Sequence, residues 1–163
     1  MKKLLFAALL MSLSLLSFAT NPPIKNIVGL WQVESATMVM NVQHIAVAVD
    51  MSKAFISFQF NDNGGYIQKN YDFKIRQMDI IRAVTGKQTT VYPKVKDDII
   101  VMDGRYTFRN NILNLTQGEE SDSYNVITHQ SNLITLQQTY AADGGAEIGE
   151  MSVKMKIKLK RIK

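Results

Sequence analysis

Residues 26–35, NIVGLWQVES, contain Trp31, the single tryptophan in a chain of 163 residues. Trp31 follows Gly29 by two residues and stands in the first segment of the chain that resembles a β-strand. An indole ring this close to the start of a folded domain needs a surface to rest on. The rest of the sequence must therefore provide a partner for this ring.

Residues 1–19 have the composition of a secretory signal peptide. Lys2 and Lys3 precede a nearly unbroken apolar run, and Ser17-Phe18-Ala19 offers small residues at a cleavage site. The run is too short to span a bilayer comfortably, although an uncleaved anchor is the alternative. We therefore expect one exported domain over residues 20–163, periplasmic or secreted, with no stable membrane insertion. The chain has no cysteine, so it is neither a lipoprotein nor a disulfide-bonded protein.

Charge is distributed unevenly along the chain. The formal net charge is +5, but six basic residues lie in the final ten positions, and the rest of the expected domain is mildly acidic. In SVKMKIKLKRIK, residues 152–163, lysines alternate with apolar residues, which predicts a strand with one buried face. No aromatic residue interleaves with these lysines as a nucleic-acid surface would require, so we expect no nucleic-acid partner.

Three further stretches predict β-hairpins. Residues 55–73, 104–118 and 122–140 each alternate apolar and polar residues around turn residues at 61–65, 110–111 and 130–132. Residues 43–54 fit a strand or a short helix, and we favour the helix; residues 74–90 have near-helical apolar spacing without a decisive pattern. These elements predict an all-β protein, an antiparallel meander closed into a small barrel of about eight strands, with room for one short helix.

The tryptophan segment also carries a family resemblance. Gly29-Leu30-Trp31 resembles the Gly-x-Trp signature of the calycins, which include lipocalins and fatty-acid-binding proteins. Together with the hairpin patterns at 58–66 and 104–115, the chain is similar to small bacterial lipocalin-like domains. The resemblance implies a lipocalin-like barrel in which the tryptophan packs across the closed end beneath a basic side chain from the last strand.

The alternation of inward and outward side chains along the last strand identifies a candidate for that basic side chain. Continuing the alternation of the last strand places Arg161 on its inward face. An inward arginine is costly unless another group receives it, and a tryptophan ring can do so by a cation–π interaction. We therefore predict that Gly29, Trp31 and Arg161 close one end of the barrel. The alternative is an ordinary core tryptophan and a solvated arginine.

Signatures of enzymes are scarce. The sequence has no cysteine nucleophile, no phosphate-binding glycine loop and no Gly-x-Ser-x-Gly motif. His44 and His129 lie far apart and have no neighbouring carboxylate at metal-ligand spacing. We expect a protein that is not an enzyme and that has neither a cofactor nor a metal site.

Aromatic and methionine side chains suggest a lining for the barrel. Methionine adapts to irregular partners and suits an apolar ligand. With the calycin resemblance, this predicts a carrier that binds a small hydrophobic molecule inside the barrel. The alternative is a solid core, the protein then being an interaction or inhibitory module that binds a protein or an envelope polymer through its rim loops or basic last strand. The candidate ligand-binding residues are Phe58, Phe60, Tyr66, Phe73, Tyr106, Phe108 and Met155.

Overall fold

The computed structural model describes residues 26–143 and 149–162, apart from the side chains of residues 128–130. The predicted signal peptide, residues 1–19, lies outside the described residues. The described elements are β1 (Gly29–Val42), β2 (Ile45–Asp50), β3 (Phe55–Phe60), β4 (Gly65–Lys74), α2 (Gln77–Val84), β5 (Thr90–Val91), β6 (Lys94–Arg109), β7 (Ile112–Gln117), β8 (Glu120–Gln130), β9 (Leu133–Asp143) and β10 (Glu150–Arg161).

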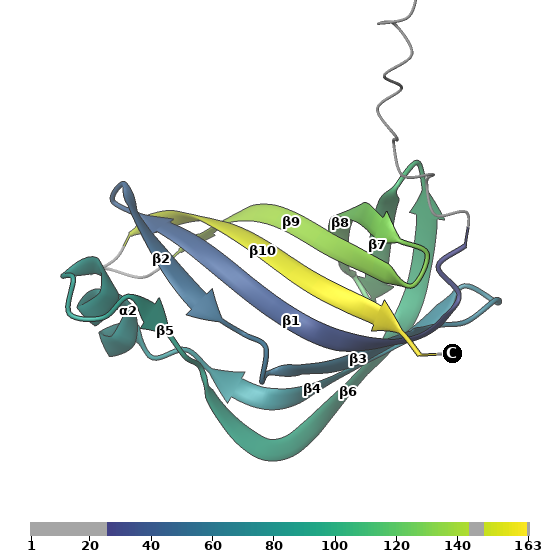
Figure 1. Ribbon diagram of the computed structural model, residues 1–163, viewed down its shortest axis with the longest axis horizontal. Coiled ribbons are helices and arrows are strands. Elements are labelled where there is room, and N and C mark those ends of the chain that lie inside the picture. Colours follow the sequence, from purple (N-terminus) through teal and green to yellow (C-terminus); the bar gives the residue numbers. More distant parts are fainter. Residues whose placement is uncertain (1–25, 144–148, 163) are drawn as a thin grey trace, which may run out of the picture.

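Eight of these strands close into an antiparallel barrel. The ring runs β1-β3-β4-β6-β7-β8-β9-β10, and β10 returns to pair with β1 along its whole length, from Trp31 opposite Arg161 to Val42 opposite Met151. β2 pairs with the second half of β1, and β5 adds to β2 in parallel. Figure 1 shows β1 and β10 side by side along the molecule. The predicted fold class, a closed all-β meander with one short helix, is confirmed.

The alternating pattern determines which side chains face the interior. In β10, Val153, Ile157 and Leu159 are buried, whereas Lys154 and Lys156 are exposed. The predicted hairpin turns are present, and the turn between β6 and β7 has two residues with unusual backbone angles. Asn110 and Asn111 join β6 to β7 with φ values of 52° and 61°, in the left-handed region that asparagine tolerates.

Residues 43–54 are a strand and a turn, so the expected helix is wrong. β2 buries Val47 and Val49 and exposes Ala46 and Ala48. The alternation is real, but small alanines on the outer face give it little contrast in the sequence. In the segment at 74–90 the near-helical spacing does form a helix, α2, whose Ile80 is buried in the core.

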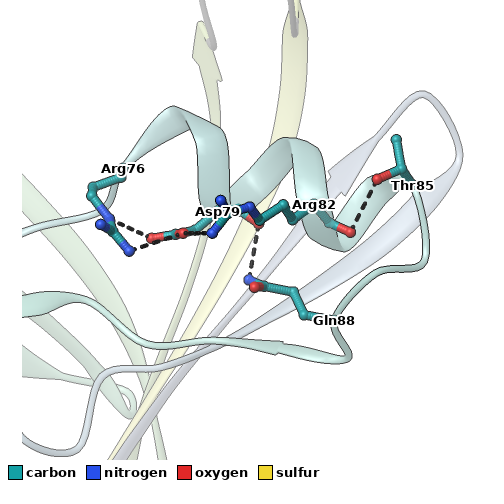
Figure 2. Close-up of polar contacts among 5 residues, drawn as sticks. All are labelled: Arg76, Asp79, Arg82, Thr85 and Gln88. Atoms are coloured by element: carbon teal, nitrogen blue, oxygen red, sulfur yellow. Dashed lines mark hydrogen bonds and ion pairs between the residues drawn. The ribbon is translucent and has the colours of Figure 1, made fainter.

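Polar contacts around Asp79 stabilise α2 (Figure 2). The Asp79 carboxylate accepts hydrogen bonds from Arg76 Nε at 2.7 Å and Nη2 at 3.1 Å, and lies 3.7 Å from Arg82 Nη1. Gln88 Nε2 donates to the backbone oxygen of Asp79 at 3.0 Å, tying the loop after the helix to its first turn. An acidic residue in the first turn also complements the partial positive charge of a helix amino terminus.

Helix α2 occupies one end of the molecule. It contacts β2 and β5, and Figure 1 shows these three elements together at the end opposite the end of β10. Within the described residues, no helix is long and apolar enough to cross a membrane.

Candidate functional site

Trp31 and Arg161 meet at one end of the barrel. The Trp31 side chain is fully buried, and the Arg161 guanidinium carbon lies 4.5 Å from the centroid of its ring. Trp31 Nε1 donates to the backbone oxygen of Ile27 at 2.8 Å, and Arg161 Nη2 donates to the backbone oxygen of Asn26 at 2.8 Å. The segment before β1 is therefore tied to both residues, and the first and last strands meet at this contact.

Aromatic side chains complete the closed end beside Trp31. Gly29 has a φ of 139°, which disfavours any residue with a Cβ atom, and it pairs with Phe60 on β3. Phe60 stacks on Phe58 with ring centroids 6.2 Å apart and meets the edge of Tyr106 at 5.1 Å. The Tyr106 hydroxyl donates to the backbone oxygen of Asn61 at 2.8 Å. Phe58, Phe60 and Tyr106 thus pack against one another at this end of the barrel.

A cavity of about 220 Å³ lies in the barrel interior. It reaches from β4 and β6 across to β8 and β10. Its apolar and aromatic lining consists of Phe55, Tyr66, Phe73, Met102, Leu115, Tyr124 and Met155.

The same cavity has a polar wall on β4. Gln68 and Asn70 line it and are buried, with exposed fractions of 8% and 6%. Gln68 Nε2 donates to Asn70 Oδ1 at 3.0 Å. This bond uses one N–H of Gln68 and the side-chain oxygen of Asn70. The side-chain oxygen of Gln68 and the side-chain NH₂ group of Asn70 remain to bond water or a ligand. Buried amides are costly unless hydrogen-bonded, which makes this wall a candidate recognition element.

Two carboxylates lie where the cavity opens to solvent. Glu120 and Asp122 of β8 line the cavity and are exposed. Gln138 Nε2 donates to Asp122 Oδ1 at 2.8 Å. The ion pairs found among the described residues join Asp79, Asp72 and Glu34 to basic side chains, and none involves Glu120 or Asp122.

The negative charge of Asp122 affects three tyrosines. Burial raises the pKa of Tyr124, and the negative charge of Asp122 raises it further. The same two causes, in the same order, raise the pKa values of Tyr66 and Tyr140. Of these three tyrosines, Tyr66 and Tyr124 line the same cavity as Asp122.

The opening follows from the short β7–β8 hairpin. β7 pairs only with residues 105–109 of β6, and β8 pairs only with residues 133–137 of β9. The remainders of β6 and β9 are each paired on one side alone, to β4 and β10. Figure 1 shows β7 and β8 gathered at the end away from α2. The unpaired parts of β6 and β9 therefore leave a gap in the barrel wall, the notch, next to the cavity. The exposed Ile99 and Val101 of β6 lie beside it.

The structure separates the seven candidate ligand-binding residues into two groups. Tyr66, Phe73 and Met155 line the cavity. Phe58, Phe60 and Tyr106 pack the closed end, and Phe108 is partly buried against the core without lining the cavity. The polar wall and the mouth were not among the candidates. The sequence does carry a signal for the polar wall, because Tyr66, Gln68 and Asn70 are alternate residues of one strand and therefore face the same side.

Metal-ligand geometry is absent from the residues that the structure describes, which contain no group of three or more His, Cys, Asp or Glu side chains able to hold an ion. His44 lies in the β1–β2 turn with a φ of 69°. The side chain of His129 lies outside the described part.

Comparison with known proteins gives one weak structural similarity. No protein-family model matches the sequence, and no curated protein matches it. The solved structure of the S-type phycobiliprotein lyase CPES from Guillardia theta is similar over 84% of this chain and 89% of that chain. The identity is 8% and the TM-score is 0.35.

Proposed function

We propose that this protein is an exported lipocalin-like carrier that binds one small molecule in the interior of its barrel. The supporting observation is the cavity of about 220 Å³, which has an aromatic and methionine lining on one side and buried amides on the other. Binding sites of this kind are mostly apolar, with a few polar groups that orient the ligand. The Gly-x-Trp resemblance and the contact of Trp31 with Arg161 agree with the proposal.

The lining also refines the expected ligand. A purely hydrophobic molecule would cover Gln68 and Asn70 without satisfying their remaining hydrogen-bonding groups. The ligand of this proposal is therefore amphiphilic, with an apolar body and at least one polar group. The cavity is smaller than the ~300–1,000 Å³ of typical ligand pockets, so the molecule is small.

Filling the cavity tests the proposal. Met155 and Met151 both lie on β10 and are partly buried, but only Met155 lines the cavity. We expect 2-phenylethanol, followed by calorimetry or ligand-observed NMR, to bind at about one per chain. Met155→Trp should abolish that binding, whereas Met151→Trp should retain it. Equal behaviour of the two variants would contradict an interior site. Native mass spectrometry of protein from its natural source would then reveal the retained ligand as added mass.

The unpaired edge of β6 favours a second candidate function. Ile99 and Val101 are exposed there, with exposed fractions of 55% and 56%. An extended peptide can add to such an edge through backbone hydrogen bonds. A module of this kind would bind a peptide at the edge of β6 rather than a molecule in the barrel interior, and Met155→Trp would leave the peptide binding unchanged.

A further inference from the structure

The charge at the mouth of the cavity defines the class of ligand, an inference that rests on the proposed function. We propose that the barrel selects small aromatic or short-chain amines. Their ammonium group is held by Asp122 and Glu120 at the mouth, and their apolar body enters the cavity between Tyr66, Tyr124 and Met155. The site would thus bind cations and reject anions of the same shape.

The first argument is the absence of a protein cation opposite the carboxylates. No lysine, arginine or histidine is among the residues that line this cavity. Asp122 receives one hydrogen bond from the neutral amide of Gln138, and a carboxylate can accept about four. Its negative charge is therefore uncompensated where a ligand would pass. Hydrogen bonds between an ammonium and a carboxylate are about twice as strong as neutral ones.

The basic residues of nearby strands face other directions. Met155 points inward from β10, so the exposed Lys154 and Lys156 on either side of it point outward. Lys69 of β4 is exposed between the inward Gln68 and Asn70. Lys96 of β6 is an ion-pair partner of Asp72. These lysines thus lie away from the cavity, Arg161 is held over Trp31 at the closed end, and the mouth keeps its negative charge.

The second argument is the tyrosines beside the carboxylates. Tyr66 and Tyr124 line the cavity and are buried, with exposed fractions of 5% and 7%. Tyrosine ring faces attract cations, and aromatic side chains form the cages that bind alkylammonium groups. The hydroxyls of both tyrosines are neutral at physiological pH, as tyrosine hydroxyls ordinarily are, and their raised pKa values extend that neutral range upward.

The discrimination against anions follows from the same groups. A carboxylate ligand would meet Asp122 and Glu120 with no basic side chain to balance it, and this repulsion favours the amine. Gln68 and Asn70 are neutral and can bond a second polar group on either ligand. Gln68 and Asn70 therefore contribute to the affinity for either ligand, whereas Asp122 and Glu120 determine the preference for a cation.

Three probes with one aromatic body separate the contributions. These are 2-phenylethylammonium, 2-phenylethanol and phenylacetate, each titrated calorimetrically into the whole mature chain. We expect the amine to bind about tenfold more tightly than the alcohol, and phenylacetate to bind more weakly than either. The doubly substituted variant Asp122→Asn/Glu120→Gln should lose the amine's advantage and keep the alcohol's affinity. Asp62→Asn, a change at an exposed carboxylate in the β3–β4 turn, is the matched control and should change nothing.

The outcomes distinguish this inference from the proposed function. If none of the three probes binds, the interior site itself is wrong. If the alcohol or phenylacetate binds as tightly as the amine, the site stands and its preference for amines is wrong. Retention of the amine's advantage in the doubly substituted variant would also overturn the inference. Unchanged unfolding midpoints for the variants exclude misfolding as the cause of any loss.

Discussion

Trp31 is the residue at which the two ends of the described chain meet. Its ring faces the Arg161 guanidinium, and its indole nitrogen bonds to the segment before β1. Arg161 Nε is buried without a hydrogen-bond partner among the described residues. A buried donor without a partner is costly, and contact of the guanidinium with the ring helps to offset that cost.

A double-mutant cycle measures this contact. Trp31→Ala removes a fully buried ring and should lower the free energy of unfolding by about 3–5 kcal/mol. Arg161→Ala should cost less, because the cation–π contact, its packing and one hydrogen bond to Asn26 are lost. The two losses should not add, since both mutations abolish the same contact. Denaturant unfolding of the four proteins gives the coupling energy.

An arginine elsewhere supplies the control for that cycle. Arg109 ends β6 and is exposed. The cycle of Trp31→Ala with Arg109→Ala should give a coupling energy near zero. A value near zero for Arg161 as well would mean that the guanidinium contributes nothing through the ring.

At the scale of elements, the sequence predicts most clearly the strands in which large apolar residues alternate with charged or polar ones. β10 alternates lysine with large apolar residues, and the turn at Asn110-Asn111 has residues that tolerate its backbone angles. For β2 the sequence allowed a strand or a helix and the helix was wrongly favoured, because alanine occupies the outer face of the strand. Its turn, at Gln43 and His44, has positive φ values at residues that rarely signal a turn.

The candidate site was predictable only in part, for a related reason. The calycin resemblance implies that the tryptophan meets a basic side chain of the last strand, and the alternation of that strand identifies Arg161, so their meeting could be predicted. The cavity instead depends on where β7 and β8 stop. Alternation identifies the two faces of a strand, but it does not show which neighbouring strand is too short to cover a face. The acidic mouth at Asp122 could therefore be located only from the strand pairing in the structure.

Gly104 on β6 lies close to the backbone of β7 and to the Tyr66 ring. A Cβ atom at Gly104 would lie 2.2 Å from the backbone oxygen of Thr116 and 2.9 Å from Tyr66 Cε1. Gly104→Ala must therefore move the backbone where β6 and β7 meet and also displace the Tyr66 ring, and we expect it to lower the free energy of unfolding by about 1–3 kcal/mol. Because Tyr66 lines the cavity, probe binding should weaken as well.

Gly65 on the neighbouring strand provides the comparison. A Cβ atom there would meet the flexible side chain of Asn63 at 3.1 Å rather than backbone. Gly65→Ala should therefore cost less than Gly104→Ala in denaturant unfolding and leave probe binding intact. Similar losses for both variants would mean that the close approach at Gly104 relaxes easily.

At the scale of the whole molecule, the barrel separates its charges. Lysines cover the outer face of β10, carboxylates lie at the mouth of the cavity, and the end at Trp31 is closed by packing. A meander that pairs its first and last strands leaves fewer free edges than an open sheet. The notch between β6 and β9 is one place where strand edges stay unpaired, and Met102 in that part of β6 lines the cavity.

The buried tyrosines make the stability of the whole barrel sensitive to alkaline pH. Burial raises the pKa values of Tyr66, Tyr106, Tyr124 and Tyr140 above their ordinary value in the folded state. Unfolded tyrosines ionise from about pH 10, whereas the folded ones remain protonated. The resulting stability is present below that pH and is lost as the pH rises toward the folded pKa values. The free energy of unfolding should therefore decline above about pH 10.

Tyr124 should contribute most to that decline, because the side chain is deeply buried and its pKa is raised by both burial and Asp122. Tyr124→Phe removes one titrating group, so the alkaline slope should fall by up to about 1.4 kcal/mol per pH unit. Tyr92→Phe, at a side chain with an exposed fraction of 65%, is the control and should keep the original slope. Lysine titration is common to both variants, so their difference isolates Tyr124. Denaturant unfolding from about pH 8 to 11 measures the slopes, and identical slopes for the two variants would show that Tyr124 ionises as readily in the folded barrel as in the unfolded chain.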